Sequence, residues 1–296
     1  MQARDPIQPL EPARYPVEHR DRRIGGILAA EGKLDRAGIE QVLEVQQARG
    51  LRFGEAALRL NLITAEDLRQ ALAKQYDYPY VPLSGDGFSS DLAPARDPHH
   101  PQAEQLRSLR TQLLVRWSRL EHPPRALAIV SPGPFEGRSY LCANLAVLFA
   151  QLGLRTLLID ADLRAPRQHE IFGVSDRFGL SAVLSSRAGR DAPLPVPAFG
   201  ALSVLPAGAR PPNPQELLWR PTLATFLEGA DVEYDVILLD TPPARENADA
   251  QAAAFSAKSV LVLARANHSR ADETAGLVRT FRDAGALVLG TVLNKL

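Results

Sequence analysis

The chain has 296 residues, more than one hydrophobic core usually holds, which favours at least two domains. Basic and acidic residues balance at 34 each, so no overall field favours nucleic acid or an anionic membrane. The single cysteine, Cys142, excludes an internal disulfide and suits a reducing cytoplasm. No stretch approaches the ~18 apolar residues of a membrane helix, so we expect any membrane role to come through a partner.

Two segments of unusual composition divide the chain. Residues 1–20 are rich in proline and charge, which predicts a disordered arm. Residues 83–100 hold prolines, glycines and serines without apolar periodicity, which predicts a linker. The segments between and after them, residues 21–82 and 101–296, are therefore the expected folded domains.

The first of these segments contains an internal repeat. RIGGILAAEGKLDRAGIEQVLEVQ at 23–46 aligns with RFGEAALRLNLITAEDLRQALAKQ at 52–75. Apolar residues recur at three- and four-residue steps in each copy, which predicts a helix pair joined near Gly32 or Asn61. The repeat thus predicts a small all-α unit of four helices.

Helix starts can be placed within each copy. Asp35 and Thr64 precede the second helix of their copies and are predicted N-caps. Thr64 with Asp67 forms the pattern of a capping box, with Asp in place of the usual Glu or Gln.

The repeat resembles the MshEN domain, the N-terminal domain of type II secretion and pilus assembly ATPases. In that family two tandem Arg-apolar-Gly motifs bind cyclic di-GMP, and paired arginines suit phosphates and guanine rings. The resemblance implies a cyclic di-GMP site at Arg23, Gly25, Arg52 and Gly54. The alternative is a helical docking domain, whose glycines allow close packing and whose arginines are solvated.

Residues 101–117 follow the linker and are predicted to form a helix, from the spacing of their leucines. Glu104, Arg107 and Arg110 lie three residues apart and so share one face of it. Taken alone, they form an ordinary charged stripe.

From residue 126 onward, short apolar runs alternate with helical stretches. Runs such as ALAIVS, RTLLIDAD, LSVLPAG, YDVILLDTPP, SVLVLAR and ALVLGTVLN are apolar almost throughout. Such strands predict a parallel sheet covered on both faces, and right-handed crossovers make it a doubly wound α/β fold. Ligands bind beyond the carboxyl ends of strands in these sheets.

A candidate phosphate loop follows the first of these strands. SPGPFEGRSY at 131–140 places Gly133 and Gly137 before a helix predicted to begin near Ser139. Backbone amides there can bind a phosphate, helped by the helix N-terminus, and Ser139 offers the hydroxyl that a phosphate-bound magnesium needs. Arg138 stands where such loops carry lysine.

Acidic residues end two other strands. Asp160 and Asp162 end LLIDAD, and Asp240 ends VILLD. One such aspartate could simply cap a following turn. Three of them beyond the same sheet edge as a phosphate loop favour a nucleotide site.

These motifs resemble the bacterial tyrosine kinases over residues 101–296. SPGPFEGRSY is similar to their Walker A loop, LLIDADLRAPRQHEIFG to Walker A-prime, and VILLDTPP to Walker B. NPQELL at 213–218 is similar to a segment of these kinases that related partitioning ATPases lack. With the repeat, the architecture resembles the EpsG-type chain-length-determinant tyrosine kinases of exopolysaccharide operons, where Gly-Arg-Ser-Tyr is the usual loop ending.

The resemblance implies a role for each motif residue. Arg138 would contact the β- and γ-phosphates, while Ser139 would ligate Mg²⁺ with Asp240 acting through water. Asp160 and Asp162 would position the metal and the attacking tyrosine hydroxyl. The implied catalytic residues are Arg138, Asp160, Asp162 and Asp240; the implied metal site is Ser139, Asp160 and Asp240; the implied ATP site is Phe135, Glu136, Gly137, Arg138, Ser139, Tyr140 and Asn294.

The resemblance also implies partners. Glu104, Arg107 and Arg110 fit the family's E-x-x-R-x-x-R motif, through which subunits contact one another in a ring. A membrane-embedded chain-length determinant would recruit the cytoplasmic chain to the inner membrane. The implied activity is an ATP-dependent tyrosine kinase that regulates exopolysaccharide chain length and export.

Two other functions stay open on the sequence. A nucleotide-binding pseudokinase is favoured by Arg138, by Phe135 where relatives carry a small residue, and by a missing C-terminal tyrosine cluster. Tyr76, Tyr78 and Tyr80 form the only cluster, and we predict that they pack against the repeat helices. A ParA- or MinD-like positioning ATPase would carry a signature lysine at Gly133.

Overall fold

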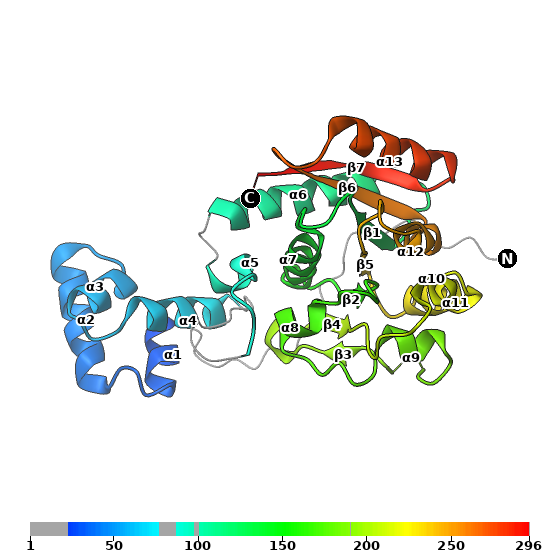
Figure 1. The fold of residues 1–296 in the computed structure, drawn as a ribbon. Helices are drawn as coiled ribbons and strands as arrows, with labels where there is room; N and C mark the ends of the chain where they lie inside the picture. The colour runs from blue at the N-terminus through cyan, green and yellow to red at the C-terminus, as the bar shows by residue number, and fades with distance from the viewer. Residues whose placement is uncertain (1–22, 77–86, 98–100, 190, 296) are drawn as a thin grey trace. The chain divides into compact units, whose positions relative to one another are not determined.

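The structure is a computed structural model that describes residues 23–76, 87–97, 101–189 and 191–295. The chain divides into two units, each with its own internal contacts (Figure 1). We call them the N-terminal unit, described over residues 23–76, and the C-terminal unit, described from Gly87 onward. Each is considered by itself.

Four helices form the N-terminal unit. They are α1 (Ile24–Ala30), α2 (Arg36–Arg49), α3 (Phe53–Arg59) and α4 (Ala65–Gln75). Their apolar stripes bury a small core that includes Leu28, Val42 and Ala71. The predicted caps are confirmed: Asp35 accepts from the Gly38 amide at 2.7 Å, and the Thr64 hydroxyl accepts from the Asp67 amide at 3.1 Å.

The C-terminal unit is built on a sheet of seven strands with the order β3-β4-β2-β5-β1-β6-β7. The strands are β1 (Ala126–Val130), β2 (Thr156–Asp160), β3 (Leu194–Pro195), β4 (Leu202–Leu205), β5 (Val236–Asp240), β6 (Ser259–Arg265) and β7 (Leu287–Asn294). All six predicted strands pair in parallel. The two-residue β3, which the sequence did not predict, pairs antiparallel with β4 at one edge.

Helices cover both faces of this sheet, which confirms the predicted doubly wound fold (Figure 1). They are α5 (Ala93–Arg96), α6 (Pro101–Trp117), α7 (Arg138–Ala150), α8 (Gln168–Phe172), α9 (Leu180–Leu184), the 3₁₀ helix η1 (Pro197–Phe199), α10 (Pro214–Leu218), α11 (Pro221–Ala230), α12 (Asp249–Ala257) and α13 (Ala271–Asp283). The α7 helix packs on β1, β2 and β5, with α6 beside it, while α12 packs on β1 and β6 with α10 and α11.

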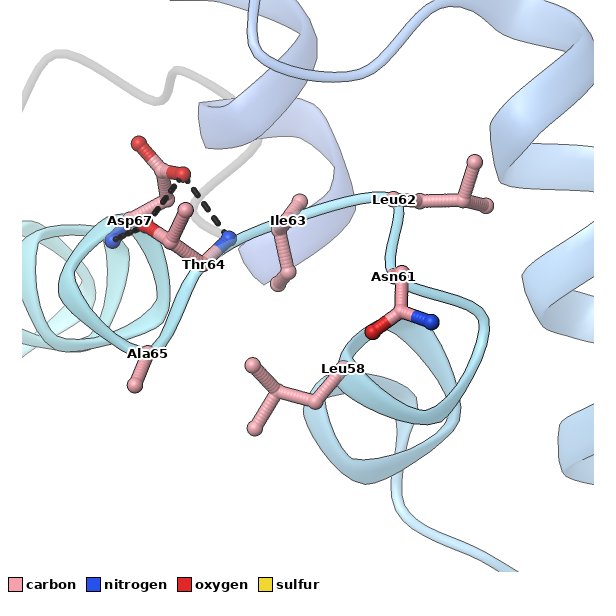
Figure 2. A pocket seen from close by; sticks show the side chains of 7 residues that line it. All are labelled: Leu58, Asn61, Leu62, Ile63, Thr64, Ala65 and Asp67. Carbon is pink, nitrogen blue, oxygen red and sulfur yellow. Dashed lines mark hydrogen bonds between the residues drawn. The ribbon is translucent and has the colours of Figure 1, made fainter.

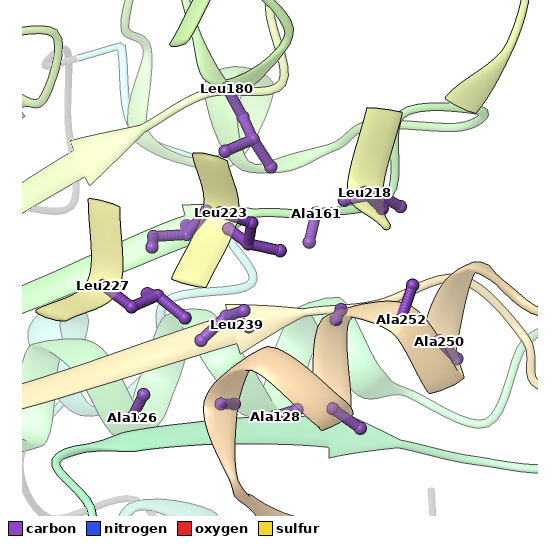
Figure 3. Packing of buried hydrophobic residues seen from close by; sticks show 14 of the residues in the cluster. Ala126, Ala128, Ala161, Leu180, Leu218, Leu223, Leu227, Leu239, Ala250 and Ala252 are labelled. Atoms are coloured by element: carbon purple, nitrogen blue, oxygen red, sulfur yellow. The ribbon is translucent and has the colours of Figure 1, made fainter. Parts of the chain in front are cut away.

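Alternation along the strands divides the core between these two faces. Ala128 and Leu239 belong to the cluster under α11 and α12, and Leu223 closes it from α11 (Figure 3). Their neighbours Leu127 and Leu238 are equally buried but belong to the opposite face, because successive strand residues point to opposite sides. Burial on both faces is why β1 and β5 are apolar up to their last residues.

Two segments differ from the sequence-based expectations. The residues 215–229, one of the helical stretches expected between the apolar runs, form two helices, α10 and α11, because Pro221 cannot donate a helical hydrogen bond and instead begins a new helix. Residues 87–97, inside the expected linker, include α5, and Leu92 and Ala95 there are buried. The expected arm at 1–20 lies outside the described residues.

Within the described parts of the chain, no helix is both long enough and apolar enough to cross a membrane.

Candidate nucleotide site

The loop between β1 and α7 has a backbone that only some residues tolerate. Gly137 has φ of +97°, and a Cβ there would lie 2.5 Å from Nδ2 of Asn294, so glycine is required. Phe135 adopts φ of +57°, a left-handed conformation that is unfavourable for a bulky side chain. Its ring is 81% exposed, so it does not fill the loop.

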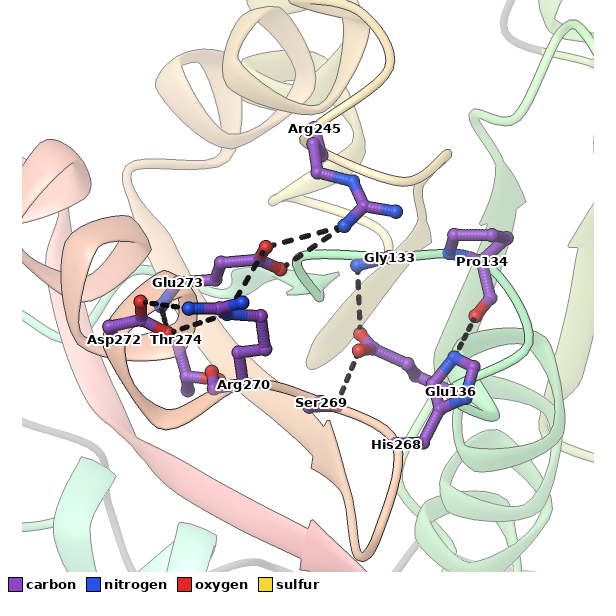
Figure 4. Close-up of polar contacts among 10 residues, drawn as sticks. All are labelled: Gly133, Pro134, Glu136, Arg245, His268, Ser269, Arg270, Asp272, Glu273 and Thr274. Carbon is purple, nitrogen blue, oxygen red and sulfur yellow. Dashed lines mark hydrogen bonds and ion pairs between the residues drawn. The ribbon is translucent and has the colours of Figure 1, made fainter.

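Glu136 folds back under the same loop. Its carboxylate accepts a hydrogen bond from the Gly133 amide at 3.1 Å and another from the Ser269 hydroxyl (Figure 4). The side chain is 1% exposed. Glu136 therefore ties the start of the loop to the segment between β6 and α13.

Three further side chains hold the loop through its carbonyl oxygens. The ring Nε2 of His268 lies 3.1 Å from the carbonyl oxygen of Pro134, which Figure 4 also shows. The other two pairs are Arg265 Nη1 with the Phe135 oxygen at 2.9 Å and Asn294 Nδ2 with the Glu136 oxygen at 3.0 Å. The place of Asn294 in the ATP site stays a prediction; in the structure its side-chain amide supports the loop.

Arg138 lies inside the loop rather than extending from it. Its Nε donates to the carbonyl oxygen of Thr241 at 2.8 Å, and its Nη1 donates to that of Gly133 at 2.6 Å and to the Ser131 hydroxyl. The residue is 8% exposed. The guanidinium thus joins both sides of the loop to the chain just beyond β5.

Asp160 and Asp240 face each other at the ends of neighbouring strands, where they are register partners. Both are fully buried. Burial raises the pKa of Asp160 well above its usual range, and the nearby charge of Asp240 adds to this. Burial raises the pKa of Asp240 to about 6, although the hydrogen bond from Gln168 and the nearby Ser139 hydroxyl oppose the shift.

Hydrogen bonds leave one oxygen of this pair unused. Asp160 accepts from the backbone amides of Arg167 and Gln168, each at 2.9 Å. Asp240 accepts through Oδ2 from Nε2 of Gln168 at 2.8 Å. Among the residues that the structure describes, Oδ1 of Asp240 has no hydrogen-bond partner although it is buried.

Asp162 has a more local role. Its Oδ1 accepts from the amides of Arg164 and Ala165 at 3.1 and 2.9 Å, so it caps the turn that follows β2. The Arg164 side chain pairs with buried Asp249 at 2.7 Å. Asp162 is 7% exposed and follows the carboxyl end of β2, two residues after Asp160.

The oxygen ligands at this edge suit a hard cation such as Mg²⁺. The orphaned Oδ1 of Asp240, the Asp160 carboxylate and the Ser139 hydroxyl are candidates. In the described part of the chain, no three His, Cys, Asp or Glu side chains gather closely enough to hold a metal alone. A magnesium ion here would therefore depend on water and nucleotide phosphates for its remaining ligands, which is its usual habit.

Gln168 is a site residue that the sequence reasoning missed. It opens α8, is fully buried, and contacts Asp160, Asp240 and Ser139. The only available signal was its place inside the segment that follows the paired aspartates.

Tyr140 is half-buried; burial raises the pKa of its phenol, and its hydroxyl lies 3.4 Å from Oε1 of Gln102.

The charged triplet on α6 makes contacts within the chain. Arg107 pairs with Glu104 at 3.0 Å, and Nη1 of Arg110 donates to the Leu148 carbonyl oxygen at 3.1 Å. The ring contact predicted for these residues stays a prediction.

In the N-terminal unit the motif glycines lie where helices approach closely. A Cβ at Gly54 would be 2.6 Å from Leu68, and one at Gly25 would be 3.0 Å from the Phe53 ring. Arg23 and Arg52 are exposed. A pocket of about 430 Å³ in this unit lies at the α3–α4 turn, between Leu58 and Asp67, and none of the four motif residues lines it (Figure 2).

Comparisons with known proteins point to one group. No protein-family model matches the chain. The putative tyrosine-protein kinase CapB of Staphylococcus aureus is 35% identical over 66% of this chain and 84% of its own length. The kinase domain of Escherichia coli tyrosine kinase ETK is 30% identical, with a TM-score of 0.67 over 73% of this chain and 84% of that one. The septum-site-determining protein MinD of Pyrococcus horikoshii, solved with Mg-ADP, is 26% identical with a TM-score of 0.51 over 57% of this chain and 69% of that one.

Proposed function

The chain belongs to the family of bacterial tyrosine kinases, and from this premise we propose that it transfers the γ-phosphoryl group of ATP to a tyrosine hydroxyl. The observation that carries the proposal is the buried, unpartnered Oδ1 of Asp240 beside Asp160 and the phosphate loop. A buried polar atom without a partner costs free energy, so it indicates a ligand at that position.

Each residue of the site has its own role in the proposed phosphoryl transfer. Loop amides and the Arg138 guanidinium would bind the phosphates, and Ser139 and Asp240 would hold Mg²⁺, which would offset phosphate charge. The tyrosine oxygen forms a bond to the γ-phosphorus as the bond to the β–γ bridging oxygen breaks, and ADP leaves. The phenol proton passes to an aspartate at this edge of the sheet, and Asp160, at the end of β2 next to Asp240, is the candidate.

A phosphotyrosine blot after incubation with ATP and Mg²⁺ tests the proposal. We expect signal from the wild type and at least a hundredfold less from Asp160→Asn. Measurable ATP affinity with no signal, alone or with the cytoplasmic tail of a membrane partner, would instead support a pseudokinase. The three protein oxygens around Arg138 favour that second function, because the cation must leave them to reach phosphate.

The phosphate acceptor can be narrowed by exposure. We predicted packing for Tyr76, and this was wrong: its side chain is 74% exposed at the end of α4. Tyr78 and Tyr80 lie outside the described residues. Tyr234 is partly buried against the core, and Tyr140 is half-buried. If the kinase acts on its own chain, mass spectrometry should find phosphate at Tyr76 and not at Tyr234.

We further propose that the chain is an EpsG-type component of exopolysaccharide export that works with a membrane chain-length determinant. Ring assembly through Glu104 and Arg107 is part of this proposal, supported by the exposed Glu104 side chain on α6, with which Arg107 pairs. Sedimentation of wild type and Glu104→Arg, with ATP, tests it. A monomer in both would remove the ring from the proposal.

For the N-terminal unit we propose docking to a partner, supported by glycines that serve helix packing. An MshEN-like cyclic di-GMP site is the second candidate, and exposure of Arg23 and Arg52 favours it. Titration with cyclic di-GMP decides between them. Binding that is lost in Arg23→Ala but kept in Arg36→Ala, an exposed arginine of α2 outside the motif, would support the ligand site.

A further inference from the structure

Gln168 occupies a point where three parts of the site meet. Its backbone amide donates to Oδ2 of Asp160 at 2.9 Å. Its side-chain Nε2 donates to Oδ2 of Asp240 at 2.8 Å and to the carbonyl oxygen of Ser139 at 3.1 Å. One residue therefore links β2, β5 and the first turn of α7, and it is fully buried.

The orientation of this side-chain amide is fixed by its neighbours. Both atoms within reach of Nε2 are acceptors, so the amide nitrogen must lie toward them and the oxygen must point elsewhere. Within the described residues, Oε1 of Gln168 is buried and has no hydrogen-bond partner. The same holds for Oδ1 of Asp240, on the carboxylate that Gln168 contacts.

Gln168 Oε1 and Asp240 Oδ1 are thus two buried acceptors without donors, on side chains that are hydrogen-bonded to each other. Buried acceptors are normally hydrogen-bonded, so we expect a donor near them when the ligand is present. A water molecule held by a metal is such a donor, because the cation strengthens its O–H groups. Among the described residues neither oxygen accepts a hydrogen bond, and the nearby Ser139 hydroxyl is itself a candidate metal ligand.

We propose that Gln168 is a positioning residue for magnesium-nucleotide binding. By donating to Oδ2 of Asp240 it keeps Oδ1 directed at the metal site, and through Oε1 it accepts from a magnesium-bound water. This inference rests on the proposed function, because it assumes a magnesium-nucleotide complex at the loop. It adds a residue that takes part through hydrogen bonds and does not itself contact the phosphates.

A purely structural role makes a different prediction. The bond between the Gln168 backbone and Asp160 does not depend on the side chain, so α8 keeps its connection to β2 in a variant. If the side chain only supports the loop through the Ser139 carbonyl, nucleotide affinity should fall equally with and without metal. If the side chain orients Asp240 and the metal-bound water, only the increase in nucleotide affinity that magnesium gives should become smaller.

Gln168→Met in the full chain separates these roles, because methionine is unbranched and similar in size but offers no comparable donor or acceptor. ADP affinity is measured by calorimetry with Mg²⁺ and, separately, with EDTA. Gln70→Met, on α4 of the N-terminal unit, is the matched control. Thermal unfolding of each variant without nucleotide checks the fold.

We expect the ratio of affinities with and without Mg²⁺ to fall about tenfold or more in Gln168→Met, as for other residues that orient metal ligands. Affinity in EDTA should stay within about threefold of wild type, and Gln70→Met should match wild type throughout. An unchanged ratio overturns the inference alone, as does an equal loss with and without metal. If the wild type itself gains nothing from Mg²⁺, the proposed function fails together with the inference. A wild type that gains from Mg²⁺ yet yields no phosphotyrosine leaves the inference standing and removes only the kinase activity.

Discussion

Arg138 donates hydrogen bonds to three oxygens on both sides of the loop and beyond β5. Its guanidinium donates to two carbonyl oxygens and one hydroxyl in a buried position, whereas a lysine would place a single nitrogen among them. The fork shape of arginine therefore has a structural consequence before any nucleotide binds. This consequence can be measured in the ligand-free protein.

We expect Arg138→Met to lower the free energy of unfolding by about 2–4 kcal/mol, because buried acceptors lose charged donors. Arg138→Lys should lower the free energy of unfolding by roughly half as much, because one ammonium group can donate to only some of these acceptors. Urea unfolding without nucleotide measures both variants. Equal stability of wild type and Arg138→Met would contradict the contacts described for the guanidinium.

Phe135 stores strain in the same loop. Its left-handed backbone costs a non-glycine residue energy, and its exposed ring gains little from packing. We expect Phe135→Gly to raise the free energy of unfolding by about 0.5–1 kcal/mol while nucleotide affinity is retained. The control is Phe178→Gly, another exposed phenylalanine, which has no positive φ and should be neutral or slightly destabilised. Destabilisation of Phe135→Gly by more than the control would show that the ring makes a contact in solution.

At the scale of single elements, α4 depends on its first turn. Thr64 and Asp67 cap each other's backbone amides, and Asp67 also pairs with Lys33 at 2.9 Å. Hydrogen bonds from Thr64 and Lys33 lower the pKa of Asp67 to about 2. A lowered folded-state pKa means that the carboxylate stabilises the fold above its unfolded value of 3.8 and stops doing so as pH falls toward 2.

Asp67→Ala should therefore weaken protection of the α4 amides against hydrogen exchange at neutral pH, where a lost cap costs about 1 kcal/mol. The difference between wild type and variant should persist down to about pH 4 and shrink as pH falls toward 2. Exchange is followed by mass spectrometry over this range. A difference that stays constant down to pH 2 would mean that the Asp67 charge does not contribute.

Elements also differ in how well local sequence specified them. Helix α6 has the predicted bounds, and the caps of α2 and α4 were predicted, because spacing and capping act within a few residues. The strand β3 and helices α8, α9 and α12 were not predicted. They are short or alanine-rich, and their positions depend on what they pack against.

At the scale of the molecule, each unit has its own apolar cluster. Leu28 is fully buried in the N-terminal unit, and Leu239 is fully buried in the C-terminal unit. Since core stability depends on the contacts around each side chain, truncation in one unit should leave the other unaffected.

We expect Leu28→Ala and Leu239→Ala each to lower the free energy of unfolding of the unit that contains the residue by about 2–5 kcal/mol. Hydrogen exchange resolved by segment should show lost protection in 23–76 for the first variant and in the sheet strands for the second. Loss of protection in both units from either variant would mean that they unfold as one.

The sequence by itself determined six strands of the sheet, the repeat helices and the site motifs. Continuous apolar runs indicated the parallel sheet, and the loop at 131–140 and the aspartates ending β2 and β5 predicted the nucleotide site. These signals are local, since they rest on residue spacing and on where polar residues end an apolar run.

Only the tertiary structure decided which side chains meet at that site. Strand order brought Asp160 opposite Asp240, and packing brought Gln168 to both, Arg138 to the chain beyond β5, and the β6–α13 segment to the loop. These partners are far apart in sequence, and a spacing pattern carries no record of which buried acceptor a distant donor will satisfy. Burial then raised the pKa values of Asp160 and Asp240, because it removes solvent from their carboxylates, and no local motif encodes this loss of solvent.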